Sequence, residues 1–214
     1  MELLTVDPQH PERRVLDLAA QAMMRGSVIA FPTDTVYGIG CSLFDVAAVE
    51  LIGKLKRRAP NHAYISLIPE PSQADGLALS IPPVARLLIR QFWPGPLSLI
   101  LPAAEIVPAS VRGQGGTVAL RCPRDPLSHA LLNRFGGPVI SSSANLSGQP
   151  PAETAEEVVR TFGNQLDLVL DGGPRRGAVP STLVDVSGQR PKLLRRGALD
   201  VTASLGEHDD LTSR

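Results

Sequence analysis

The chain has 214 residues, 43% of them hydrophobic and 20% charged, and its 21 basic and 21 acidic residues give a formal net charge of zero. A neutral chain has no overall field to attract nucleic acid or an anionic membrane, so any anion site must be local. The N-terminus lacks an apolar leader, and no stretch approaches the roughly 18 consecutive apolar residues of a membrane span, so we expect a cytoplasmic protein.

The first part of the chain predicts two helices and two strands. Apolar residues recur at helical spacing from Val15 through Leu18 and Ala19 to Ala22, and Gly26 ends that helix. A strand at 28–31 follows at once. Asp45 caps a second helix, for which we expect a buried stripe of Ala48, Leu51, Ile52 and Leu55, and a short strand at 65–68 comes next.

The remainder continues the same alternation. We expect a helix around 84–88, and Trp93-Pro94-Gly95-Pro96 then turns the chain into a strand at 97–101. After a strand at 117–121, Asp125-Pro126 begins a helix that Gly136 ends, and a strand starts at 139. Thr154 and Glu157 form a capping box, and the last strands are expected at 168–170, 182–186 and 192–195.

Alternating helices and strands predict an α/β fold, with helices packed around a twisted mixed β-sheet. We expect a single domain over residues 1–199 and a loosely ordered tail over 200–214, because the tail has weak periodicity. Cys41 and Cys122 lack the spacing of a metal site or a redox motif, so we expect two buried thiols and no metal ligands.

One polar cluster, FPTDTVYGIG at 31–40, lies where the strand 28–31 ends. Open α/β sheets place ligands at strand ends, and Thr33, Thr35 and Tyr37 offer hydroxyl groups there. The alternative is turn chemistry, in which the threonines bond local backbone and Tyr37 packs inward.

A second cluster, KLKRRAPNH at 54–62, follows a predicted helix. Pro60 favours extended backbone at Ala59, and in extended chain Lys56 and Arg58 point the same way while Arg57 points away. Two cations would then converge on one anion. The alternative is a solvated helix end that carries favourable positive charge.

The third cluster is SSSANLSG at 141–148. Buried hydroxyls need partners, so three serines after an apolar strand are poor core material. Together with free backbone N–H groups before a helix, Ser143 and Asn145 make a plausible phosphate cradle, and a flexible linker is the alternative. Thr117 and Arg121 share one face of their strand, since side chains alternate along it.

In chain order, PTDTVYGIG, KxR, PGPLSLIL, TVALR, SSSANLSG and PSTLVD resemble the YrdC family, whose best-known members are threonylcarbamoyl-AMP synthases. The resemblance runs from about residue 12 to residue 197. It implies a single-domain YrdC-like fold with a deep, positively lined cleft. It also implies that L-threonine, bicarbonate or CO₂, and ATP form threonylcarbamoyl-AMP and pyrophosphate. That product serves N6-threonylcarbamoyladenosine formation at position 37 of tRNA, which would need separate transfer proteins.

The resemblance also implies two sets of site residues. Threonine would be bound by Thr35, Arg121, Ser141 and Ser181. ATP would be bound by Lys56, Arg58, His62, Thr117, Ser143, Asn145 and Arg196. Lys56 and Arg58 would be the catalytic residues, stabilising charge rather than exchanging protons, and Mg²⁺ would neutralise the leaving pyrophosphate.

The segment 59–64 departs from the synthase pattern, because Ala59 and Asn61 stand where synthases usually have proline and aspartate. In this segment the chain is more similar to YciO, a paralogue. The synthase is our hypothesis, and two alternatives stay open. One is a YciO-like paralogue acting on another small molecule, and the other is a non-catalytic protein that binds double-stranded RNA or tRNA through the same cleft. Neutral net charge counts against the second alternative.

Overall fold

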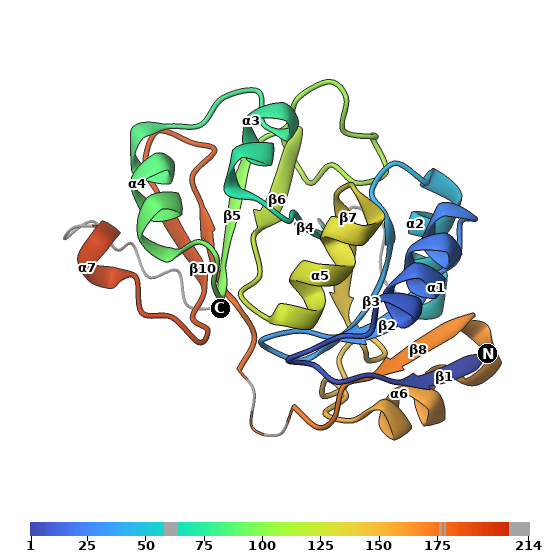
Figure 1. Cartoon of the computed structure of the whole chain (residues 1–214). Helices are drawn as coiled ribbons and strands as arrows, with labels where there is room; N and C mark the ends of the chain where they lie inside the picture. The colour runs from blue at the N-terminus through green and yellow to red at the C-terminus, as the bar shows by residue number, and fades with distance from the viewer. Residues whose placement is uncertain (58–63, 176, 178, 206–214) are drawn as a thin grey trace.

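The computed structural model describes residues 1–57, 64–175, 177 and 179–205, and these form one mixed sheet of ten strands with helices on both faces (Figure 1). The strands are β1 (Glu2–Thr5), β2 (Ile29–Pro32), β3 (Tyr37–Ser42), β4 (Ile65–Leu67), β5 (Leu97–Pro102), β6 (Thr117–Arg121), β7 (Val139–Ser143), β8 (Leu168–Asp171), β9 (Thr182–Asp185) and β10 (Lys192–Arg195). The α-helices are α1 (Arg13–Met24), α2 (Val46–Leu55), α3 (Ala74–Leu77), α4 (Pro83–Phe92), α5 (Pro126–Phe135), α6 (Ala155–Phe162) and α7 (Thr202–Leu205). The predicted α/β class is therefore confirmed.

The strand order is β1-β8-β2-β3-β7-β4-β6-β5-β9-β10. Strand pairs β1/β8, β2/β8, β4/β6 and β5/β9 are parallel, and β2/β3, β3/β7, β4/β7, β5/β6 and β9/β10 are antiparallel. This order places the three polar clusters of the sequence close together, because β2, β3 and β7 are neighbours and α2 leads into β4 beside them.

Two apolar cores cover the faces of the sheet. On one face α1 and α5 contact each other and pack over β2, β7 and β8, as Figure 1 shows. On the other face α2, α4 and α6 bury their apolar sides in a larger core that includes residues of β2, β3, β5, β6, β7, β8 and β9. Burial of this kind is the main stabilising term of the fold.

Local signals fixed the helix boundaries as predicted. The Asp45 carboxylate accepts from Ala48 N at 3.0 Å, and Asp125 accepts from Ser128 N at 2.8 Å. Thr154 accepts from Glu157 N at 3.3 Å, although the Glu157 carboxylate accepts from Glu153 N rather than from the cap residue itself. Each cap satisfies an N–H group that the first helical turn leaves without a partner.

The structure differs from the sequence prediction at several places. Leu51 of the predicted stripe is 39% exposed, because the buried side of α2 runs through Ala48, Val49, Ile52 and Leu55. The edge strand β1 was not predicted. Nor was β3, whose glycines hide its strand pattern; a Cβ on Gly40 would lie 2.3 Å from Ile140 O, so only glycine permits this approach of β3 to β7.

The predicted tail begins inside the packed body. Val201 is buried in the core and α7 follows it, while the rest of the tail, 206–214, lies outside the described residues. No helix among the described residues is long and apolar enough to span a membrane.

Candidate active site

A cavity of about 640 Å³ opens on the sheet face that α1 and α5 cover only in part. Its floor comes from alternate residues of neighbouring strands: Gly38 on β3, Ser141 and Ser143 on β7, Ile65 and Leu67 on β4, Ala119 and Arg121 on β6, Ile100 on β5 and Leu183 on β9. The register explains this set, because Ile65 is paired with both Ser141 and Ala119, and Leu67 is paired with Arg121. Paired residues share a face of the sheet.

One end of the cavity is the turn between β2 and β3. Thr33 Oγ1 and Thr35 Oγ1 are 3.0 Å apart, and both residues are buried. Arg121 donates from Nη1 to Thr35 Oγ1 at 3.1 Å and from Nε to Gly95 O at 3.2 Å, and its Nη2 pairs with the Asp34 carboxylate. Arg121 is 4% exposed, and these contacts fix the direction of its guanidinium.

A second guanidinium lies near this end. Arg195 donates from Nε to Ser181 O at 3.0 Å and from Nη2 to Ser181 Oγ at 3.1 Å, and Ser98 Oγ is 2.9 Å from the same hydroxyl. Desolvation, and next the positive charge of Arg121, lower the pKa of Arg195. Two cations beside one carboxylate leave net positive charge here, which favours an anion.

At the other end, Lys56 organises the serine loop. Its Nζ donates to Asn145 O at 2.8 Å and to Asn145 Oδ1 at 3.1 Å, and it also contacts Ser143 O. Backbone joins the same two segments, because Ser147 N donates to Lys56 O at 3.0 Å. Lys56 is 3% exposed, so its ammonium holds the loop 143–147 in place as well as lining the cavity.

The structure brings together most of the site residues that the resemblance implied. Those lining the cavity are Thr35, Lys56, Arg121, Ser141, Ser143, Asn145 and Ser181. Thr117 and Arg196 are not among the lining residues: the Thr117 hydroxyl donates to Gln114 O at 3.1 Å, and Arg196 is exposed. Arg58 and His62 lie outside the described residues.

The expected geometry of the basic segment is wrong at its start. Lys56 has helical angles (φ −81°, ψ −6°) and Arg57 is left-handed (φ 52°), so the chain is not extended there. Arg57, expected to point away, lines the cavity. Helical backbone continues through Lys56 and becomes left-handed at Arg57, which the Pro60 signal could not reveal.

Arg195 is the lining residue that sequence reasoning passed over in favour of Arg196. The register of β10 against β9 shifts between Leu193 and Arg195, which places Arg195 opposite Leu183, a residue of the cavity floor. Without the extra residue, alternation would have turned Arg196 to that face. A β-bulge of this kind has no reliable sequence signal here.

Tyr37 packs inward, as the turn-chemistry alternative for that residue holds. It is fully buried, its hydroxyl donates to Gly173 O at 2.8 Å, and burial raises its pKa. Thr33 and Val36, in contrast, line the cavity, so the turn 33–36 contributes to the site through its other side chains. Cys41 and Cys122 are both free and buried, as expected, and the described residues contain no cluster that could hold a metal ion.

The fold and the site define an α/β protein whose mixed sheet carries a cavity lined by guanidinium, ammonium and hydroxyl groups. The family model for Sua5/YciO/YrdC, described as "Telomere recombination", matches residues 21–197. The chain belongs to this family.

Relatives and solved structures agree with that assignment. The chain is 38% identical over 182 residues to threonylcarbamoyl-AMP synthase of Pyrococcus abyssi, covering 85% of this chain and 54% of that protein. It is 37% identical over 199 residues to the Bacillus subtilis synthase, covering 92% and 56%. The chain thus spans about half the length of these two relatives.

A putative threonylcarbamoyl-AMP synthase of Mycobacterium tuberculosis is nearer in length, with 39% identity over 191 residues that cover 89% of this chain and 87% of that protein. Among solved structures, P. abyssi Sua5 complexed with L-threonine superposes with a TM-score of 0.92 at 35% identity, covering 97% of this chain and 62% of the other. E. coli YciO superposes with a TM-score of 0.88 at 28% identity, covering 96% and 100%.

Proposed function

We propose that the chain is a threonylcarbamoyl-AMP synthase, which converts L-threonine, CO₂ or bicarbonate, and ATP into threonylcarbamoyl-AMP and pyrophosphate. The observation that carries the proposal is one cavity with Thr35, Arg121 and Ser181 at one end and Lys56 with the serine loop at the other. The names of the synthases from P. abyssi and B. subtilis and the L-threonine complex of Sua5 support it.

The threonine carboxylate would bind at Arg121. Contacts to Gly95, Thr35 and Asp34 use three N–H groups of this guanidinium, which carries five. Within the described part of the chain, two N–H groups are left for a carboxylate. Arg195 adds a second positive charge nearby, which compensates the charge that Asp34 removes. Ser141 and Ser181 would complete this end with hydroxyl groups.

The reaction would proceed in two steps that the cavity can hold. The threonine amine attacks CO₂ and loses a proton, which gives a carbamate. A carbamate oxygen then attacks the α-phosphorus of ATP, and the bond from that phosphorus to the leaving pyrophosphate breaks. Such transfers depend mainly on positioning and charge stabilisation, which a lining rich in cations and hydroxyls supplies.

The nucleotide would lie at the end formed by Lys56, Ser143 and Asn145. Arg57, which lines the cavity, adds positive charge toward the phosphates. Arg58 and His62 remain predictions for ATP, as does Mg²⁺. The described lining contains no carboxylate, so these residues do not form a protein-held magnesium site, and we derive no step through the ion. Magnesium would enter with the phosphates of ATP, as it commonly does.

The test is release of pyrophosphate from ATP in the presence of threonine and bicarbonate, with threonylcarbamoyl-AMP identified by mass spectrometry. Pyrophosphate release should require threonine and should fall when bicarbonate and CO₂ are removed. Threonine-independent turnover, or none at all, would overturn the proposal.

The YciO-like alternative stays open because the match to E. coli YciO covers 96% of this chain and 100% of YciO. It predicts no threonine-dependent pyrophosphate. Supply of the product for tRNA modification is a further part of the proposal, tested by adding tRNA and the transfer proteins and measuring threonylcarbamoyladenosine. Salt-sensitive tRNA binding that persists in Lys56→Ala would instead favour the RNA-binding alternative.

A further inference from the structure

The turn that carries Thr33 and Thr35 has little support of its own. Strand β2 ends at Pro32 and β3 begins at Tyr37, so the four residues between them lie outside the sheet ladder. Inside the turn, Thr33 N and Oγ1 donate to Val36 O at 3.2 and 2.8 Å. These short-range bonds shape the turn but do not fix its place relative to the cavity.

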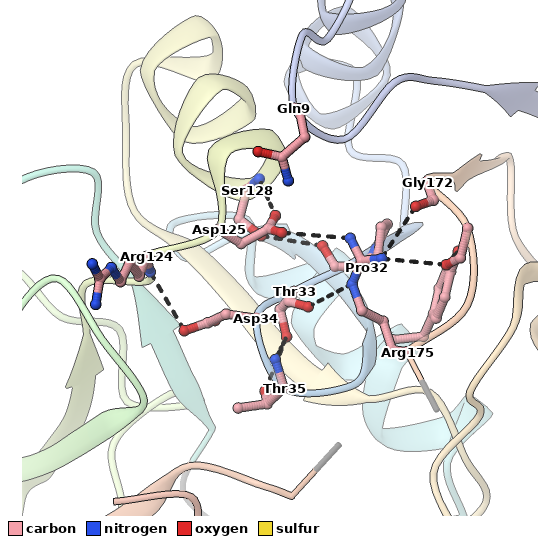
Figure 2. Close-up of polar contacts among 12 residues, drawn as sticks. Gln9, Pro32, Thr33, Asp34, Thr35, Arg124, Asp125, Ser128, Gly172 and Arg175 are labelled. Atoms are coloured by element: carbon pink, nitrogen blue, oxygen red, sulfur yellow. Dashed lines mark hydrogen bonds and ion pairs between the residues drawn. The ribbon is translucent and has the colours of Figure 1, made fainter. Parts of the chain in front are cut away.

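Arg175, which follows β8, reaches the backbone of the turn at Thr33 (Figure 2). It donates from Nε to Thr33 O at 2.9 Å and from Nη1 to Gly172 O at 3.1 Å. Its Nη2 lies 3.4 Å from Asp125 Oδ1. One planar guanidinium therefore connects the turn, its own loop and the start of α5, a fixed geometry that lysine cannot reproduce.

Asp125 and Ser128 extend this support. Ser128 Oγ lies 3.1 Å from Pro32 O and 3.0 Å from Asp125 Oδ2, and its single hydroxyl proton is shared between these two acceptors, as Figure 2 shows. Both side chains are buried. Burial raises the pKa of Asp125, and the hydrogen bonds from Ser128 and then the charge of Arg175 oppose that rise. Two successive carbonyl groups, at 32 and 33, are thus anchored to one charged network.

The network leads to the proposed threonine site through two further contacts. Thr33 Oγ1 meets Thr35 Oγ1, which in turn accepts from Arg121. Arg175 itself is not among the residues that line the cavity. We infer that Arg175 is a positioning residue for threonine binding: it fixes the turn 33–36 so that Thr35 and Arg121 stay aligned, without touching the substrate. This inference rests on the proposed function.

The experiment measures threonine and ATP affinity by calorimetry for the wild type, Arg175→Ala and Arg175→Lys. Only one of the Arg175 hydrogen bonds reaches the turn, and one charged hydrogen bond corresponds to about a tenfold change, so Arg175→Ala should weaken threonine binding about tenfold and ATP binding less than about twofold. The threonine affinity of Arg175→Lys should lie between those of the wild type and Arg175→Ala, because lysine keeps the charge opposite Asp125 but cannot donate to Thr33 O and Gly172 O together. Adding methylguanidine to Arg175→Ala should restore part of the threonine affinity.

Arg112 provides the matched control. It also organises a loop, donating from Nε to Val107 O at 2.8 Å and from Nη2 to Glu105 O at 2.9 Å, but none of these residues lines the cavity. Arg112→Ala should lower the melting temperature as Arg175→Ala does and leave threonine affinity unchanged. Asp125→Asn keeps an oxygen for the helix cap and removes the charge, so combining it with Arg175→Ala should weaken binding by less than the sum of the single effects.

The outcomes distinguish failure of the positioning role of Arg175 from failure of the proposed function. Normal threonine affinity in Arg175→Ala, or an equal loss in Arg112→Ala, would overturn the positioning role alone. A wild-type protein that does not bind threonine would overturn the proposed function, and the positioning role with it.

Discussion

Replacing Lys56 by methionine tests whether this residue acts through the serine loop. Methionine keeps the length and apolar stem of the side chain and removes the ammonium. The change leaves Ser143 O, Asn145 O and Asn145 Oδ1 without their shared donor. Because Lys56 is buried, the effect should reach stability as well as activity.

The expected change in the free energy of unfolding of Lys56→Met is the difference between two opposing contributions. Each hydrogen bond from a charged donor contributes roughly 1.5–3 kcal/mol, while burial of the ammonium costs several kcal/mol, and the freed carbonyls can turn to water in the cavity. A net loss of about 1–3 kcal/mol remains. For a chain of this size that corresponds to a decrease of roughly 2–12 °C in melting temperature. Displacement of Ser143 and Asn145 by about 1 Å should lower turnover about a hundredfold.

The assay combines calorimetric melting, ATP affinity and threonine-dependent pyrophosphate release. Lys54→Met is the control, because Lys54 is an exposed residue at the end of α2, two positions before Lys56, and its replacement changes the net charge equally. It should melt within about 1 °C of the wild type. If Lys56→Met melts like the control but loses turnover, Lys56 acts on the substrate directly and the loop argument is wrong. If both stability and turnover are unchanged, Lys56 has neither role.

Three further predictions concern the cavity and the core. Gly38→Ala would place a Cβ 2.7 Å from Ser141 Oγ on the cavity floor. Threonine affinity should therefore fall about tenfold in calorimetry, and an unchanged affinity would contradict the assigned floor. Ser66 Oγ is buried and has no hydrogen-bond partner in the part of the chain that the structure describes, so Ser66→Ala should raise stability by about 1 kcal/mol in denaturant unfolding, and a loss would point to a partner. Burial raises the pKa of Cys41 to about 12 and that of Cys122 to about 11. At pH 8 neither thiol should therefore react with a disulfide reagent until the protein unfolds, and rapid labelling of the native protein would refute this.

Much of the fold was predictable because its signals are local. Asp45, Asp125 and Thr154 cap helices through hydrogen bonds that span three residues, and apolar runs such as 97–101 mark buried strands. Tertiary contacts were not needed to recognise these elements. The ordered polar motifs likewise belong to the chain itself, and the family match over 21–197 confirms the resemblance that they suggest.

Other features depend on contacts between distant residues. Strand β3 has low strand propensity, because Gly38 and Gly40 alternate with Tyr37, Ile39 and Cys41, and its pairing with β2 and β7 is what defines it. The left-handed backbone at Arg57 turned that side chain into the cavity, against the expected alternation. The support of the turn 33–36 by Arg175 joins residues 142 positions apart, and no spacing in the sequence marks it.

The sequence by itself determined which elements form and which polar residues stand at their ends, since propensity, capping and turn chemistry act over a few residues. The tertiary structure decided which of those polar residues meet. Strand register selected the cavity floor, and one extra residue in β10 turned Arg195 instead of Arg196 toward it. Side chains alternate with a period of two along a strand, so a shift of one residue exchanges the two faces, and only pairing with the neighbouring strand fixes that shift.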